Sequence, residues 1–153
     1  MTDFAQALEE GFSSARRASD ARTEIDGVFN ELDSQVLRKS EGKLSIKRGH
    51  RTSEEDFLRK IADFPALTPR PPQDYSAIIA SNPKVKAGRQ LVIAIWSQDK
   101  EGYPCRLTWG DQQHICEDKV ALAEALADLL RDPEVASILL HLRGLEVEPN
   151  ATR

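Results

Sequence analysis

The sequence predicts an α+β fold, in which a small antiparallel sheet is packed by C-terminal helices and a long N-terminal helix or helical pair extends from it. Three observations support this prediction. Apolar residues recur every three or four positions up to residue 38, short strand-like runs fill residues 91–117, and a helical repeat returns over residues 118–143. At 153 residues and 40% hydrophobic composition, the chain can bury a core without disulfides or metals.

Residues 2–38 are predicted to form one helix or two helices in line, with Thr2 or Asp3 as the cap. Unbroken, this helix would be about 50 Å long, which exceeds the ~30 Å width of a small domain. We therefore expect an overhang that forms a helical hairpin or a coiled-coil-like oligomer contact. The alternative is a break near residues 19–20, with both halves packed on their own domain. The candidate interface residues are Phe4, Leu8, Phe12, Ile25, Phe29 and Leu32.

Gly42 is suited to end this helix, and residues 43–48 alternate as an edge strand. Residues 1–37 hold eight acids and three arginines, whereas residues 38–51 hold six basic residues and one acid. The basic segment is a candidate contact for nucleic acid or a protein partner. The alternative is that it offsets the acidic helix of its own chain or of a neighbour. The candidate contact residues are Arg38, Lys39, Lys43, Lys47, Arg48 and Arg51.

The middle of the chain is predicted as a capped helix over residues 53–64, followed by a proline-rich loop over residues 65–74. Pro69–Pro72 matches a PxxP motif of the kind that SH3-like grooves bind, but a stiff surface loop is the favoured interpretation. Asp74 is predicted to cap a short helix that runs through Ile79.

Residues 91–96 are apolar on both faces, which predicts a strand at the centre of the sheet. A hairpin follows, with strands at residues 103–109 and 114–117. A two-residue turn would set Cys105 opposite Cys116, a three-residue turn would direct His114 and Cys116 outward, and a four-residue turn would set Leu107 opposite Cys116. The sequence leaves all three registers open, because a slip of one residue exchanges the faces.

Asp118 is predicted to cap the next helix, and residues 132–134 to stop it and start another that ends at Gly144. The predicted organisation is a helical element over residues 1–42, an α+β domain over residues 43–145 and a flexible tail over residues 146–153.

Two groups of residues suggest chemistry. Cys105, His114 and Cys116 could hold zinc or supply a thiol nucleophile, but the pattern lacks a CxxC pair and a fourth ligand, so buried free thiols are the favoured interpretation. Glu117 and Lys119 match the acid-x-Lys element of magnesium-dependent nucleases. The same pattern recurs at residues 41–43, so it is close to chance in so acidic a chain. No catalytic residue, metal or cofactor is therefore predicted.

These observations predict a non-catalytic interaction or regulatory protein, of the inhibitor, immunity or accessory-subunit type, that acts through its N-terminal helix and basic edge strand. A nucleic-acid-binding protein is the alternative, and a magnesium-dependent nuclease is a weaker one. The formal charge of −4 argues against a surface that grips nucleic acid everywhere. No export signal and no long apolar run are present, so the prediction is a cytoplasmic protein with protein partners or self-association and no membrane contact. Its size alone suggests a bacterial source.

Overall fold

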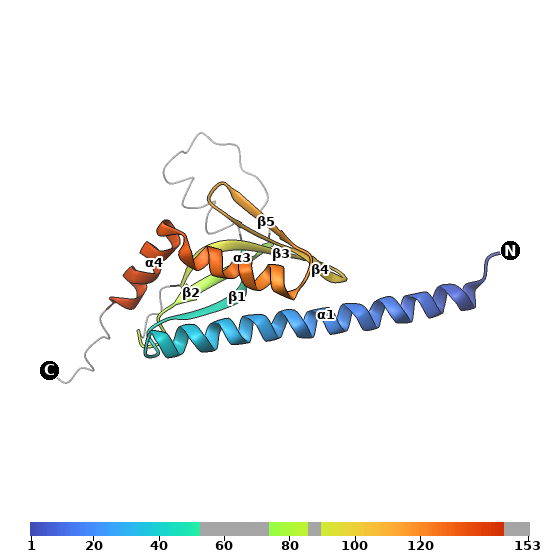
Figure 1. Cartoon of the computed structure of the whole chain (residues 1–153), viewed down its shortest axis with the longest axis horizontal. Helices are drawn as coiled ribbons and strands as arrows, with labels where there is room; N and C mark the ends of the chain where they lie inside the picture. The colour runs from blue at the N-terminus through green and yellow to red at the C-terminus, as the bar shows by residue number, and fades with distance from the viewer. Residues whose placement is uncertain (53–73, 86–89, 146–153) are drawn as a thin grey trace.

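A single unbroken helix, α1 (Phe4–Lys39), begins the chain and runs well past the rest of the domain (Figure 1). The structure is a computed structural model that describes residues 1–52, 74–85 and 90–145. Asp3 caps α1 by accepting a hydrogen bond from the amide of Gln6. Of the two alternatives the unbroken helix holds, and no break occurs near residues 19–20, because residues 13–23 contain no glycine or proline and are rich in good helix formers.

Five antiparallel strands form one sheet, and each strand pairs with the next along the chain in the order β1-β2-β3-β4-β5. The strands are β1 (Ser45–Thr52), β2 (Asp74–Ser81), β3 (Gln90–Asp99), β4 (Gly102–Trp109) and β5 (Gln112–Cys116). Two helices follow, α3 (Lys119–Arg131) and α4 (Pro133–Arg143). The predicted α+β class is confirmed, with β3 at the centre of the sheet and β1 at its edge.

The prediction of a short helix after Asp74 is wrong, because this segment is strand β2. β2 is paired on both sides, and Ala77, Ile78 and Ala80 are fully buried. In a strand that is buried on both faces the apolar residues are nearly continuous, so their spacing also fits a helical turn. The predicted helix over residues 53–64, the PxxP match at Pro69–Pro72 and the predicted tail lie outside the described residues.

The hairpin between β4 and β5 has the two-residue turn among the three that the sequence allows. Cys105 pairs with Cys116, and Leu107 pairs with His114. Gly110 begins the turn with φ +58, a left-handed conformation that glycine adopts without strain. This register directs both cysteines to the same buried face of the sheet.

Helix α1 crosses one face of the sheet, where Phe29 packs against Trp96 of β3. Helices α3 and α4 complete the cover of this face and share one hydrophobic core with α1, with Leu107 and Leu122 fully buried in it. Figure 1 shows α1 passing beside α3 and leaving the body beyond the turn between β3 and β4. The overhang is therefore the continuation of a helix whose second half belongs to the core.

Candidate interaction surface

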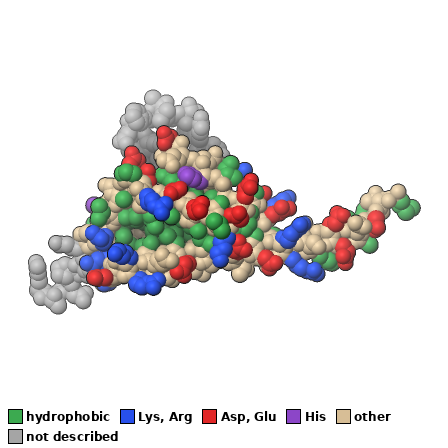
Figure 2. Space-filling view, viewed as in Figure 1, with side chains coloured by type: hydrophobic (Ala, Val, Ile, Leu, Met, Phe, Trp, Pro, Cys, Tyr) green, Lys and Arg blue, Asp and Glu red, His purple; other side chains and the backbone are tan. Residues whose placement is uncertain are grey.

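The N-terminal part of α1, residues 4–17, is the most distinctive surface of the described chain, and we call it the overhang. Every residue of the overhang is exposed except the half-buried Ser14, and the first buried residue after it is Ala18. At 1.5 Å per residue it is about 20 Å long. Figure 2 shows it projecting from the body as an isolated rod.

The overhang carries large apolar side chains that nothing covers. Phe4 is 78% exposed, Leu8 is 58% exposed and Phe12 is 52% exposed. Phe4 continues the stripe that is buried further along α1, where Ile25 and Phe29 enter the core, and Leu8 and Phe12 lie progressively to one side of it. A single stripe thus stabilises the chain's own body in its second half and faces solvent in its first half.

The direction of the overhang is set where α1 meets the turn between β3 and β4. A Cβ placed on Gly102 would lie 2.5 Å from the Cβ of Ala21, so glycine permits a close approach of turn and helix. Arg22 donates to the backbone oxygen of Lys100 at 2.8 Å. These contacts hold residues 21–24 of α1, which we call the root of the overhang, against the rest of the domain.

Tyr103 of β4 adds a third contact at the root. Its hydroxyl donates to Oε1 of Glu24 at 2.9 Å. Burial of the phenol raises the pKa of Tyr103, and its hydrogen bond to the Glu24 carboxylate and the charge of that group raise it further. The phenol therefore keeps its proton and remains a donor to Glu24 at physiological pH.

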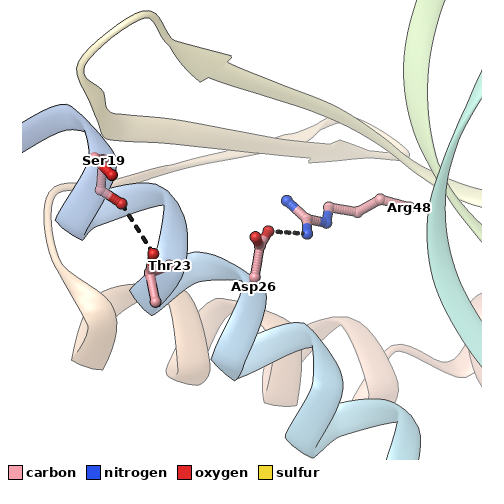
Figure 3. A network of polar contacts seen from close by, with 4 residues as sticks. All are labelled: Ser19, Thr23, Asp26 and Arg48. Atoms are coloured by element: carbon pink, nitrogen blue, oxygen red, sulfur yellow. Dashed lines mark hydrogen bonds and ion pairs between the residues drawn. The ribbon is translucent and has the colours of Figure 1, made fainter. Parts of the chain in front are cut away.

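Arg48, a predicted contact residue, is engaged inside the molecule. Its Nη2 lies 2.5 Å from Oδ1 of Asp26 on α1, as Figure 3 shows. The guanidinium carbon lies 4.4 Å from the ring centroid of Phe29 and 5.9 Å from that of Trp96. This ion pair is an instance of the basic segment offsetting the charge of its own helix, and it removes Arg48 from any extended phosphate-binding track.

The other basic residues do not form one surface with Arg48. Lys47 precedes it on β1 and points to the opposite face of the sheet, since successive strand residues alternate. Lys47 is exposed, whereas Arg51 is half-buried and donates to the backbone oxygen of Gln90. Lys47 and Arg51 therefore share the face opposite to Arg48, and Arg51 is held there by Gln90.

A smaller basic group, which we call the turn patch, forms where α1 connects to β1. Arg38 and Lys39 are exposed in the last turn of α1, and Lys43 follows in the connection. Lys84 joins them, because its Cε lies 3.2 Å from the position of a Cβ on Gly42. Figure 2 shows basic side chains gathered at this end of the molecule, away from the overhang.

A cleft of about 510 Å³ lies between α1 and the sheet, beside Arg48, and the sequence analysis did not identify it. Two of the charged residues that line it have internal partners: Arg48 pairs with Asp26, and Oδ1 of Asp33 accepts from the Ser45 hydroxyl at 2.8 Å and from the Ile46 amide at 3.0 Å. The sequence offers no signal for this cleft, because α1 and three strands each contribute only a few positions. The lining residues that were missed are Asn30, Asp33, His50, Ser76 and Gln98.

Cys105, His114 and Cys116 are brought close together, but not as a reactive site. Burial raises the pKa of Cys105 to about 12 and also raises the pKa of Cys116. The Cys105 thiol donates to the backbone oxygen of Cys116 at 3.8 Å. His114 stacks on Trp109, with ring centroids 4.6 Å apart and planes 7° apart. Both thiols therefore stay protonated, whereas a nucleophile or a zinc ligand needs a thiolate.

Glu117 and Lys119 lie at the junction of β5 and α3, and both are exposed. Asp118 between them caps α3, because its Oδ1 accepts from the amide of Ala121 at 2.8 Å. Within residues 1–52, 74–85 and 90–145, no three His, Cys, Asp or Glu side chains are grouped closely enough to share a metal ion. This junction has the geometry of a helix start.

In the same ranges, no helix combines the length and the apolar character needed to cross a lipid bilayer. No protein-family model, curated protein or solved structure matches the chain. Inferences about function therefore start from the overhang, the turn patch and the cleft.

Proposed function

We propose that this chain is a non-catalytic interaction protein of the regulatory or accessory type, and that the overhang is its docking element. The observation that supports this proposal is the exposed stripe of Phe4, Leu8 and Phe12 on a helix that is otherwise part of the core. Apolar surface of this kind gains about 25 cal/mol for each Å² removed from water. A rod of this shape is suited to a helix-in-groove or helix–helix contact.

The root contacts strengthen the proposal. A docking helix that is already folded and held in place loses little conformational entropy when it binds. Gly102, Lys100 and Tyr103 all contact α1 within residues 21–24, about one helical turn after the overhang ends. A partner bound there would have a defined orientation relative to the body.

The test is binding by the full chain and by two charge-matched variants. A candidate partner is first identified by photo-crosslinking from the overhang in cells that express the chain, and it is then purified for titration. We expect Phe12→Glu to weaken binding at least about tenfold, because the charge must be desolvated in an apolar contact. Ser13→Glu, on the solvent side of the same helical turn, should leave the affinity unchanged. Equal affinities for the parent and Phe12→Glu would refute the proposal.

Nucleic-acid binding is the second candidate, and the turn patch is the observation that favours it. Arg38, Lys39, Lys43 and Lys84 gather there, and the described segments that carry them, residues 38–51 and 82–85, contain no Phe, Tyr or Trp, so the contact would be to phosphates. A mobility-shift titration with DNA and RNA at several salt concentrations tests it. We expect Lys39→Glu with Lys43→Glu to abolish a shift that the Phe12→Glu variant retains. No shift by the parent at low salt would exclude this function.

A further inference from the structure

We infer that the partner that fits the overhang is a second copy of the same chain, bound antiparallel, so that two overhangs form a two-stranded helical seam between two bodies. This inference rests on the proposed function, because it assigns an occupant to the same surface. It is carried by the order of large and small side chains along the stripe, by the unexplained Gly11, and by the placement of charges.

The stripe places its large residues at one end and its small residues at the other. Phe4 and Leu8 come first, and Gly11 and Ala15 follow at the same helical spacing. When two copies run antiparallel about a two-fold axis near residues 9–10, Phe4 of each faces Ala15 of the other and Leu8 faces Gly11. Alternating large and small residues across a seam is what allows helices to interdigitate without voids.

Gly11 has no explanation inside one copy of the chain. A Cβ at this position would meet nothing within 4 Å, yet glycine in a helix interior costs about 1 kcal/mol relative to alanine. Gly27, the other glycine of α1, lies on the exposed side. Gly11 lies on the stripe, where the missing side chain lets a second helix approach and receive Leu8.

The charges select the antiparallel arrangement over the parallel one. Asp3 caps the overhang, Glu9 and Glu10 lie near its middle, and Arg16 and Arg17 occupy its end. In the antiparallel seam Asp3 of each copy lies level with Arg16 and Arg17 of the other, whereas Glu9 and Glu10 of the two copies face each other near the two-fold axis. A parallel seam would align acids with acids and bases with bases, which is unfavourable.

The two bodies do not collide in this arrangement. Burial against the chain's own body begins at Ala18, beyond the last seam position at Ala15. The second body lies past the N-terminus of the first helix, so the dimer is elongated, with the seam between two bodies. The seam, which runs from Phe4 to Ala15, therefore fits within the overhang, residues 4–17.

The seam is small, which sets the expected affinity. A buried phenylalanine contributes about 150–250 Å². Phe4 and Leu8 in the seam, with Phe12 on its flank, give a total of at most about 1,000 Å² from the two copies, near the lower limit for specific interfaces. We therefore expect a reversible dimer with a Kd on the order of 0.1 mM.

The first experiment is analytical ultracentrifugation of the full chain across concentrations up to about 1 mM, where a Kd of this order gives mostly dimer. The mass should rise from 17.1 kDa towards twice that value. Leu8→Glu should remain monomeric throughout, and Ser13→Glu should dimerise like the parent. A parent that stays at 17.1 kDa at every concentration, or a Leu8→Glu variant that still dimerises, would overturn the inference.

The second experiment determines the direction of the seam by disulfide trapping between single-cysteine variants. The native Cys105 and Cys116 are buried, so the parent serves as the background control. In the antiparallel seam, Phe4→Cys mixed with Ala15→Cys should crosslink. Either variant alone should not, because like positions are about 16 Å apart along the axis. Efficient crosslinking of Phe4→Cys to itself would overturn the antiparallel arrangement.

Failure of this inference can be told apart from failure of the proposed function. If the parent is monomeric but Phe12→Glu still weakens a different purified partner, only the second copy is excluded. If the parent dimerises as described and no other partner depends on Phe12, self-association is the role of the overhang.

Discussion

Gly102 and Ala21 approach so closely that a Cβ on the glycine would stand 2.5 Å from the Cβ of the alanine. Gly102 also has φ +94, so both the space and the backbone call for glycine. This contact joins the turn between β3 and β4 to α1 at the root of the overhang. The turn therefore holds α1 against the sheet and sets the direction of the exposed part of the helix.

Replacing Gly102 by alanine should therefore lower the free energy of unfolding by more than about 2 kcal/mol, from left-handed strain and overpacking together. Gly110→Ala is the matched control, because Gly110 has φ +58 but nothing within 4 Å of its Cβ position. Gly110→Ala should lower the free energy of unfolding only by the backbone strain, about 1–2 kcal/mol. Chemical denaturation of both variants measures the difference, and equal losses would show that α1 is not held by this turn.

Ile25 and Leu8 both belong to the apolar positions of α1, but truncation to alanine should lower the free energy of unfolding at Ile25 far more than at Leu8. Ile25→Ala should cost about 2–5 kcal/mol, because Ile25 is fully buried in the core. Leu8→Ala should change stability by less than about 0.5 kcal/mol, because Leu8 contacts only solvent in the monomer. Thermal unfolding of both variants, at a protein concentration too low for self-association, measures the difference. A large loss for Leu8→Ala there would mean that the overhang packs on its own body.

Arg48 and Asp26 form one ion pair, yet the two residues should contribute unequally. The side chain of Arg48 is 27% exposed and packs over Phe29, whereas that of Asp26 is 60% exposed. Arg48→Ala should cost about 1–2 kcal/mol through lost cation–π contact and packing. Asp26→Ala should cost less than about 1 kcal/mol, as exposed ion pairs do. Denaturation at low and high salt checks this, and identical losses from both variants would contradict it.

The helix caps offer a comparison between the body and the overhang. Asp118→Ala should cost about 1 kcal/mol of global stability, because this residue caps the buried helix α3. Asp3→Ala removes an equivalent cap from α1 but should leave global unfolding unchanged. It should only speed amide hydrogen exchange in the first turns, because the overhang can fray without the body unfolding.

Because the thiols of Cys105 and Cys116 are buried, the folded protein should lose stability at alkaline pH. Burial raises the pKa of Cys105 from 9.0 to about 12, so the unfolded thiol ionises first as the pH rises. The stabilisation is fully present below pH 9 and is lost between pH 9 and about 12, by at most about 1.4 kcal/mol per pH unit for this group. Raised pKa values at Cys116 and Tyr103 add losses of the same sign. Cys105→Ala should flatten the stability profile above pH 9, and an unchanged slope would refute the assignment.

Much of the fold could be read from residue patterns. The cap of α1, the central strand, the turn at residues 110–111 and the restart at residues 132–134 all depend on local chemistry and match the structure. Strand β2 was misread, because apolar residues on both faces of a buried strand give no clear period. The register of the hairpin was one of three alternatives, because the inward direction of a strand is set by what packs on it.

The site was less readable than the fold. The stripe on α1 was visible in the sequence, but which half would be buried depended on where the sheet ends beneath the helix. The six basic residues looked like one segment, yet strand alternation and the pair with Asp26 divide them. The cleft beside Arg48 was invisible, because residues distant in the sequence form it only after folding.

The sequence by itself determined that the chain makes an α+β domain that begins with a long helical element, since helical spacing is a local property. Only the tertiary structure decided that the helix is unbroken, that its first part extends beyond the body, and that Arg48 is turned inward. The physical reason is that a side chain on one element is buried only where a second element packs against it. Phe4 and Phe29 share one stripe, and only the position of the sheet buries one and exposes the other.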